Sequence, residues 1–239
     1  EDWDPCPEPL PESPQPDLRR DGGVFVIPRE LNQSTIVMAE PGGVRRAPVD
    51  PYFASRIANS ILGASGFTSR LVERVRTEEG LAYSVSSLWT APDESEGIVG
   101  AITRTRSDAT LAAIRVVLEV LEEMRREAPS RAEVRTAVDE IVNGFVFNFQ
   151  DPGQVVSRRL FYLAEGLPRD WLERYLEGIQ GVRPRDVHRV VSREVDPSRM
   201  TILVVGDTAR FEAPLESLGF GPARVIEVEA ATPPPAPRR

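Results

Sequence analysis

The apolar residues of this chain change their spacing in a fixed order, and that order limits the possible folds. Alternating, strand-like segments come first, helical spacing dominates the middle, and one strand returns near the end. This order predicts an α+β fold: one mixed or antiparallel sheet with helices packed on one face. The other face must then be turned to solvent, a cavity or a partner. The expected strands are residues 24–28, 34–40, 81–90, 96–105 and 200–206, with an edge strand at 223–229.

Several of the expected helices have recognisable ends. Asp50 is expected to cap the first helix, with Pro51 at the first helical position. Gly80, in a left-handed conformation, is expected to end a short helix. Ser130 and Glu133 have the spacing of a capping box ahead of a long helix. Apolar residues at helical spacing are Leu71, Val72 and Val75; Leu111, Ile114, Leu118 and Leu121; Val134, Val138, Ile141, Phe145 and Phe149; Trp171, Leu172, Tyr175 and Leu176; and Val187, Val190 and Val191.

Prolines concentrate at the two ends of the chain, six within residues 1–20 and four within 231–239. Such segments cannot build a packed core and are typical of extended linkers. We therefore expect residues 1–22 to be an interdomain linker, 23–229 a folded domain and 230–239 a disordered tail. Residue 1 is Glu, which indicates a processed chain or a piece of a longer one.

The side chains available exclude several classes of chemistry. All 29 basic residues are arginine, so lysine Schiff bases, a P-loop lysine and a Ser–Lys dyad are excluded. One histidine, His188, and one cysteine, Cys6, cannot form a zinc site built on histidine or cysteine. His188 lies beside Val187 and Val191, which favours a place at a helix edge over a catalytic role.

The overall charge and hydropathy narrow the set of partners. A formal net charge of −8 argues against nonspecific binding of nucleic acid and favours neutral or basic partners. No apolar run approaches the roughly 18 residues of a membrane span. We therefore expect neither a nucleic-acid partner nor a membrane span.

Arg76 and Tyr83 lie seven residues apart across the break at Gly80, in the segment RLVERVRTEEGLAYSV. One interpretation is structural: Arg76 would interact with the negative end of the helix dipole, and Tyr83 would pack half-buried beside Val85 and Trp89. The other interpretation is that the guanidinium and the phenol are directed at one point in space. The residues alone leave both interpretations open.

The segment ILGASGFTSRLVERVRTEEGLAYSVSS (61–87) resembles the second-half signature of the pitrilysin/insulinase zinc metallopeptidases, the inverzincins of the H-x-x-E-H pattern. The resemblance extends through NQSTIVMAEPGG, DEIVNGFVFNFQDP, YLAEGLPRDWLERYLEGI and MTILVVGD. It thus covers nearly the whole expected domain, and the proline-rich start resembles the end of a first half with its hinge linker.

The resemblance implies a mechanism divided between two halves. In that family two halves close around a chamber, and one carries H-x-x-E-H, whose histidines hold zinc and whose glutamate activates water. The facing half contributes an arginine and a tyrosine, positions that Arg76 and Tyr83 hold here. Such donors stabilise the negative charge that develops on the peptide carbonyl oxygen. The uncovered face of the sheet would then be turned to the chamber or to the partner half.

Two further segments have a structural and a functional interpretation. The loop GASGF resembles the glycine-containing loop that precedes this helix in the family. In the non-catalytic subunit of the related mitochondrial processing peptidase, an expanded glycine-rich version of that loop contributes to substrate binding. The shortness of the loop here favours a plain helix–helix connection, with substrate contact by Gly63, Ser65 and Gly66 as the alternative. The acidic group Asp93, Glu94 and Glu96 fits a solvated hairpin turn better than a weak calcium site.

H-x-x-E-H is absent, so this chain should not hydrolyse peptides by itself. We expect it to be the non-catalytic half of a zinc endopeptidase that encloses extended peptides, with Arg76 and Tyr83 stabilising the tetrahedral intermediate. No metal ligand is expected in this chain; zinc would be bound by a missing N-terminal half or a separate subunit, and the assembly could be a dimer. The alternative is a structural or assembly subunit of the same fold without a peptidase role. The sequence does not decide between the periplasm and the cytoplasm of a bacterium.

Overall fold

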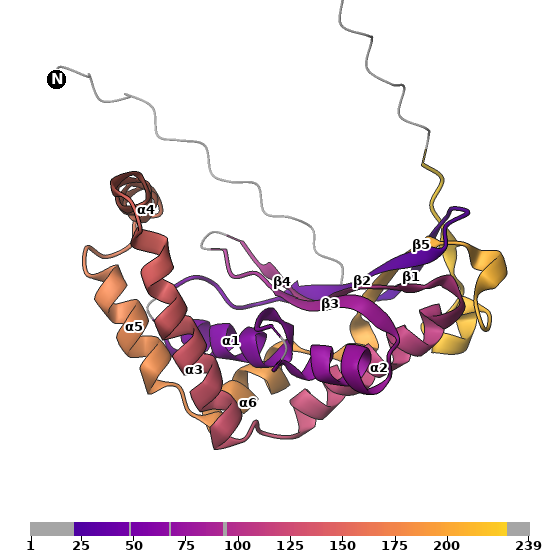
Figure 1. Cartoon of the computed structure of the whole chain (residues 1–239), viewed down its shortest axis with the longest axis horizontal. Helices are drawn as coiled ribbons and strands as arrows, with labels where there is room; N and C mark the ends of the chain where they lie inside the picture. Colours follow the sequence, from indigo (N-terminus) through magenta and orange to yellow (C-terminus); the bar gives the residue numbers. More distant parts are fainter. Residues whose placement is uncertain (1–21, 48, 67, 93–94, 229–239) are drawn as a thin grey trace, which may run out of the picture.

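The computed structural model describes residues 22–47, 49–66, 68–92 and 95–228, which form one sheet with helices packed against it (Figure 1). The sheet has six strands in the order β3-β4-β2-β5-β1-β6. Strand β1 is parallel to β5 and β6, whereas β2 is antiparallel to β4 and β5, and β3 is antiparallel to β4. The predicted α+β fold with a mixed sheet is therefore confirmed. The strands are β1 (Gly23–Pro28), β2 (Gln33–Gly42), β3 (Ala82–Trp89), β4 (Gly97–Arg106), β5 (Thr201–Gly206) and β6 (Arg224–Val225).

Helices lie below the sheet in Figure 1, while α4 stands above the level of the sheet at the left of the view. The longer helical segments are α1 (Asp50–Asn59), η1 (Ser60–Ala64), η2 (Val72–Glu78), α2 (Thr110–Arg126), α3 (Arg131–Phe145), α4 (Pro152–Ala164), α5 (Trp171–Gly181) and α6 (Pro184–Glu194). Short turns of 3-10 helix are η3 (Ser107–Ala109), η4 (Val146–Phe149), η5 (Pro197–Arg199), η6 (Thr208–Arg210) and η7 (Leu215–Leu218).

The core lies between the sheet and this helix layer. In β2, Ile36 and Met38 are fully buried, whereas Val37 and Ala39 on the opposite face are only partly covered. The same alternation runs through β5, where Ile202 and Val204 are fully buried. Because successive side chains of a strand point to opposite faces, one face packs on the helices and the other is left partly accessible.

Two of the predicted helix ends are confirmed. The Ser130 hydroxyl accepts a hydrogen bond from the Glu133 N–H (3.2 Å), and the Glu133 carboxylate accepts one from the Ser130 N–H (2.7 Å). Gly80 has φ +60°, and the Leu81 N–H after it donates to the carbonyl oxygen of Val75 (3.0 Å). These are local interactions between residues close in sequence, which is why the pattern was sufficient to predict them.

Three details of the sequence prediction are wrong. Asp50 is not the cap of α1, because its own backbone is already helical and Val49 holds the cap position; Asp50 instead lies in the first turn, where the helix dipole favours a negative charge. Helix α4 was not predicted at all, although Asp151 caps it and Pro152 occupies its first turn. The edge strand expected at 223–229 is reduced to the two residues of β6, which pair with β1.

Some predictions fall on residues outside the described part. These are the linker up to residue 21, with Cys6, the tail from residue 229, and the hairpin residues Asp93 and Glu94. The linker, domain and tail boundaries therefore stay predictions. Among the described residues, no helix combines the length and the apolar character needed to cross a membrane.

Candidate functional site

The expected loop GASGF begins inside η1, whose end is packed tightly against β3. Gly63 is buried, and a Cβ atom there would lie 2.5 Å from the backbone nitrogen of Ser87. The Ser65 hydroxyl donates to the carbonyl oxygen of Ser60 (2.8 Å) and so ends the helical segment. Gly66 is exposed, with open space where a Cβ would be. Gly63 and Ser65 therefore shape this connection, and Gly66 is its accessible residue.

The same loop is tied to α3 by two carboxylates. Arg70 donates to Glu133 through its Nε (2.7 Å), and the Thr68 hydroxyl donates to Glu140 (3.2 Å). Burial raises the pKa of Glu133, but the hydrogen bonds from Arg70 and Ser130 outweigh it, so the pKa lies below its usual range. The carboxylate of Glu133 therefore both caps α3 and anchors the start of the short helix that carries Arg76.

Arg76 lies exposed in the last turn of η2, just before the chain reverses at Gly80. Its neighbour Arg74 forms ion pairs with Glu78 (3.0 Å) and Glu79 (3.8 Å). The hydrogen bond from the Glu79 N–H to the carbonyl oxygen of Arg74 (3.1 Å) closes a wide, π-type turn. Such turns are frequent at functional sites because they alter the direction of the side chains around them.

Tyr83 lies in an irregularity of β3. Ala82 pairs with Thr105 and Ser84 pairs with Arg104, so Tyr83 is the additional residue of a β-bulge. Its side chain is 80% exposed. The interpretation of Tyr83 as a half-buried packing residue is therefore wrong: the bulge breaks the alternation that would have placed it on the buried face with Val85 and Trp89.

Two buried threonines of β4 hold the bulge in place. The Thr105 hydroxyl donates to the carbonyl oxygen of Leu81 (2.6 Å), and the Thr103 hydroxyl donates to that of Ser84 (3.0 Å). The backbone on both sides of Tyr83 is thus bound by side chains that are themselves buried. Sequence reasoning missed these residues; the alternation in TRTR would have placed both threonines on the buried face.

The accessible face beside the bulge carries further positive charge. Arg104, which pairs directly with Ser84, is exposed, and so is Arg106, which forms an ion pair with Asp108 (3.0 Å). Arg104 was also missed by sequence reasoning, although it alternates with the two threonines. The end of β4 therefore places a guanidinium next to the strand position that follows Tyr83.

His188 and the acidic residues do not form a metal site. The His188 Nε2 lies 3.3 Å from the carbonyl oxygen of Arg126, to which it can donate, so the ring connects α6 to the end of α2. Across the described ranges, no three His, Cys, Asp or Glu side chains come together as ligands could. The residues of this part of the chain therefore do not fit zinc.

The comparisons with known proteins concern the family and the fold of this chain. The family model described as the peptidase M16 inactive domain matches residues 2–141, more than half of the chain. An uncharacterised zinc protease of Streptomyces coelicolor is 28% identical over 208 residues, which are 85% of this chain and 43% of that protein. This chain thus spans less than half the length of that relative.

Solved structures share the fold. The peptidase M16 inactive domain from Pseudomonas fluorescens has a TM-score of 0.75 at 25% identity, over 83% of this chain and 47% of that one. A chain of Complex III2 from Candida albicans has a TM-score of 0.63 at 18% identity, over 77% of this chain and 46% of that one. The second likeness concerns the fold alone.

Proposed function

Because this chain belongs to the peptidase M16 family, as its inactive C-terminal domain, we propose that it is the zinc-free half of a two-half endopeptidase. In this proposal it encloses extended peptide substrates and supplies Arg76 and Tyr83 to the reaction. Zinc is bound by the complementary half, either a missing N-terminal half of the same polypeptide or a separate subunit. In this division of roles the side chains of this half do not hold the zinc, and Arg76 and Tyr83 act on the substrate.

The observation that carries the proposal is the presentation of Tyr83. A tyrosine that is 80% exposed, on a bulge held by two buried threonines, has a fixed backbone and an accessible phenol. When water adds to the scissile peptide bond, negative charge develops on the carbonyl oxygen. The phenol O–H of Tyr83 and the permanently charged guanidinium of Arg76 are donors suited to that charge.

The sheet supports the choice of an extended peptide as substrate. Strand β3 is the last strand on its side of the sheet, so its outer backbone groups are available for pairing with an added strand. Gly63, near the end of η1, is buried, so any contact of the GASGF segment with substrate would come from Ser65 and Gly66. The net charge of −8 favours basic peptides.

The proposal is tested by replacing Tyr83 with Phe in the assembled, zinc-bearing enzyme. Loss of one donor to the developing oxyanion should lower kcat by about 100- to 1,000-fold with little change in KM. Tyr175→Phe is the matched control, because it also removes one tyrosine hydroxyl, but from a ring packed in the aromatic cluster of α1 and α5. Steady-state kinetics on a fluorogenic peptide measure both constants, and equal kcat values for the two variants would exclude the catalytic role.

A second candidate function is a structural or assembly subunit of the same fold without a peptidase role. Arg76→Ala separates the two candidates when turnover and assembly are measured on the same preparation. Lost turnover with intact assembly supports the peptidase function. Unchanged turnover and unchanged assembly support the structural one.

A further inference from the structure

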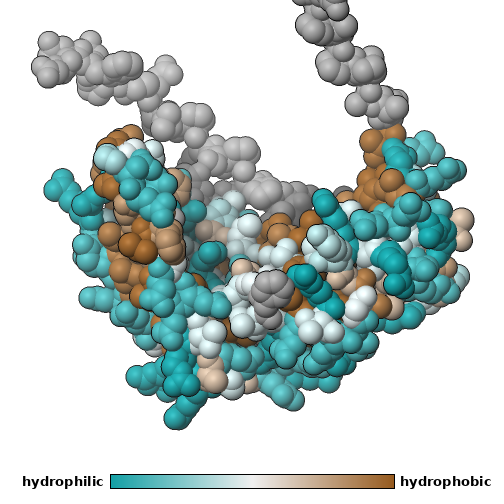
Figure 2. Space-filling model, in the orientation of Figure 1, coloured by the Kyte–Doolittle hydropathy of each residue, from teal (hydrophilic) through white to brown (hydrophobic). Residues whose placement is uncertain are grey.

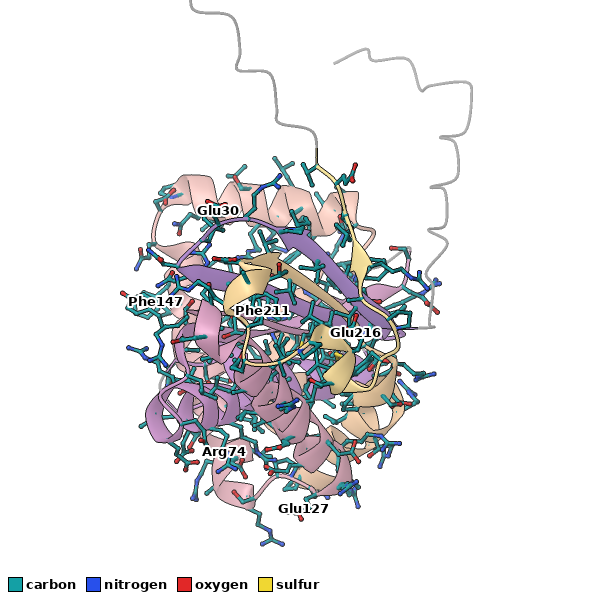
Figure 3. All side chains as sticks on the ribbon, turned by 90° about the vertical axis from the view of Figure 1, so that its right-hand side faces the viewer. Glu30, Arg74, Glu127, Phe147, Phe211 and Glu216 are labelled. Atoms are coloured by element: carbon teal, nitrogen blue, oxygen red, sulfur yellow. The ribbon has the colours of Figure 1, made fainter. Side chains whose placement is uncertain are left out.

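Large exposed apolar side chains gather at one end of the molecule. Of the fourteen with the highest exposure in the described residues, seven lie between residues 146 and 163. Figure 2 shows this concentration as brown surface at the upper left, over α4 and the adjoining helices, and Figure 3 shows Phe147 at the outer edge of the molecule. The seven residues are Val146, Phe147, Val155, Val156, Leu160, Phe161 and Leu163. Single exposed apolar residues are ordinary, but a contiguous group indicates an interaction surface.

Three of these residues form a stripe along α4. Val156, Leu160 and Leu163 are 57%, 60% and 67% exposed and follow one another at intervals of four and three residues. At 3.6 residues per turn this spacing places them on one face of the helix, as in the contact seam between packed helices. We call this set the α4 stripe. A helix in water normally turns such a face to the protein interior. Among the residues that the structure describes, none covers the stripe.

The stripe is held in a fixed orientation. Tyr162 is the buried residue of α4, about a third of a turn round the helix from the stripe. The Arg46 guanidinium lies over the ring of Phe161, 4.9 Å from its centre, and pairs with Glu165 just after the helix (2.8 Å). These contacts attach α4 to the rest of the domain through its other faces, so the stripe is directed outward.

We propose that the α4 stripe packs against an apolar helix of the complementary half. This inference rests on the proposed function, since it names the surface by which the two halves meet. The chain spans only 43% and 47% of the lengths of the relatives it matches, so each relative contains a further portion at least as long. Helix α4 also stands on the side of the sheet that the helix layer leaves open (Figure 1). A partner that closes over that face meets α4 at its margin.

The test measures association of this chain with the H-x-x-E-H half encoded with it. Leu160→Glu places a charge in the middle of the stripe and should weaken the affinity at least about tenfold, because the carboxylate would be buried without a partner. Leu31→Glu is the matched control, because Leu31 is an exposed leucine (45%) in the loop between β1 and β2. That loop lies at the right of Figure 1, whereas α4 lies at the left. Leu163→Ser is a second, milder variant, and sedimentation velocity gives each dissociation constant.

Each outcome supports or overturns the inference. Weaker association for Leu160→Glu and Leu163→Ser, with Leu31→Glu like the unaltered chain, supports it. Equal association for all variants overturns it, as does equal weakening by the stripe and control variants. Absence of any association of the unaltered chain overturns both the inference and the proposed function. Normal association of the stripe variants, combined with slow turnover of Tyr83→Phe, overturns only the inference.

Discussion

Replacing Gly63 with Ala distinguishes a packing role from a substrate-contact role for this residue near the end of η1. An added Cβ would lie 2.5 Å from the backbone nitrogen of Ser87, 2.9 Å from a methyl group of Leu71 and 3.1 Å from the carbonyl carbon of Ser86. The leucine side chain can move aside. The two β3 backbone atoms cannot move without shifting the strand, whose other residues are paired with β4.

The expected effect on stability follows from these distances. Overpacking of this kind costs about 1–3 kcal/mol. The opposing gain, from fewer conformations in the unfolded chain, is only about 0.4–1 kcal/mol. A net loss of about 1–2 kcal/mol lowers the Tm of a domain of this size by roughly 2–8 °C.

Thermal unfolding followed by circular dichroism measures this effect, with Gly66→Ala as the matched control. Gly66 is exposed, has open space around its missing Cβ and is outside the set of positive-φ glycines, so alanine should leave the Tm unchanged or raise it slightly. Equal Tm values for the two variants would refute the packing argument. In the assembled enzyme, Gly63→Ala should also lower turnover, because the displaced segment of β3 continues into the bulge at Tyr83.

Two further predictions concern the residues that hold the site in place. Thr105→Val leaves the carbonyl oxygen of Leu81 without its 2.6 Å hydrogen bond, so it should lower the free energy of unfolding by about 1–3 kcal/mol, measured in urea, and reduce kcat more than it raises KM. A stable variant with normal kcat would show that the threonine does not position Tyr83. Glu133 has a lowered pKa, so its contribution to stability is complete above the ordinary value of 4.5 and is lost as the pH falls through the folded-state value. Glu133→Gln should therefore flatten the acid limb of a stability–pH profile, whereas an unchanged limb would mean that other carboxylates dominate it.

The sequence alone was sufficient where the determining interactions are local. The capping box of Ser130 and Glu133 and the left-handed turn at Gly80 involve residues a few positions apart, so their geometry follows from residue type and spacing. The α+β class follows for the same reason, since apolar periodicity reports which segments alternate and which repeat every turn. The family resemblance selected Arg76 and Tyr83, but their roles stay a prediction.

Other features depended on which segments pack together. One interpretation of the pattern had Tyr83 half-buried beside Val85 and Trp89, and only the pairing of β3 with β4 inserts the bulge that exposes it. Gly63 was expected in a connection between helices, whereas it lies in η1, where packing on β3 leaves no room for a side chain. Helix α4 was not predicted from the sequence, because its apolar residues do not all lie on one buried face. The sequence thus determined most of the elements and the candidate residues. The tertiary structure decided which side chains are accessible, because exposure depends on contacts between segments far apart in the chain.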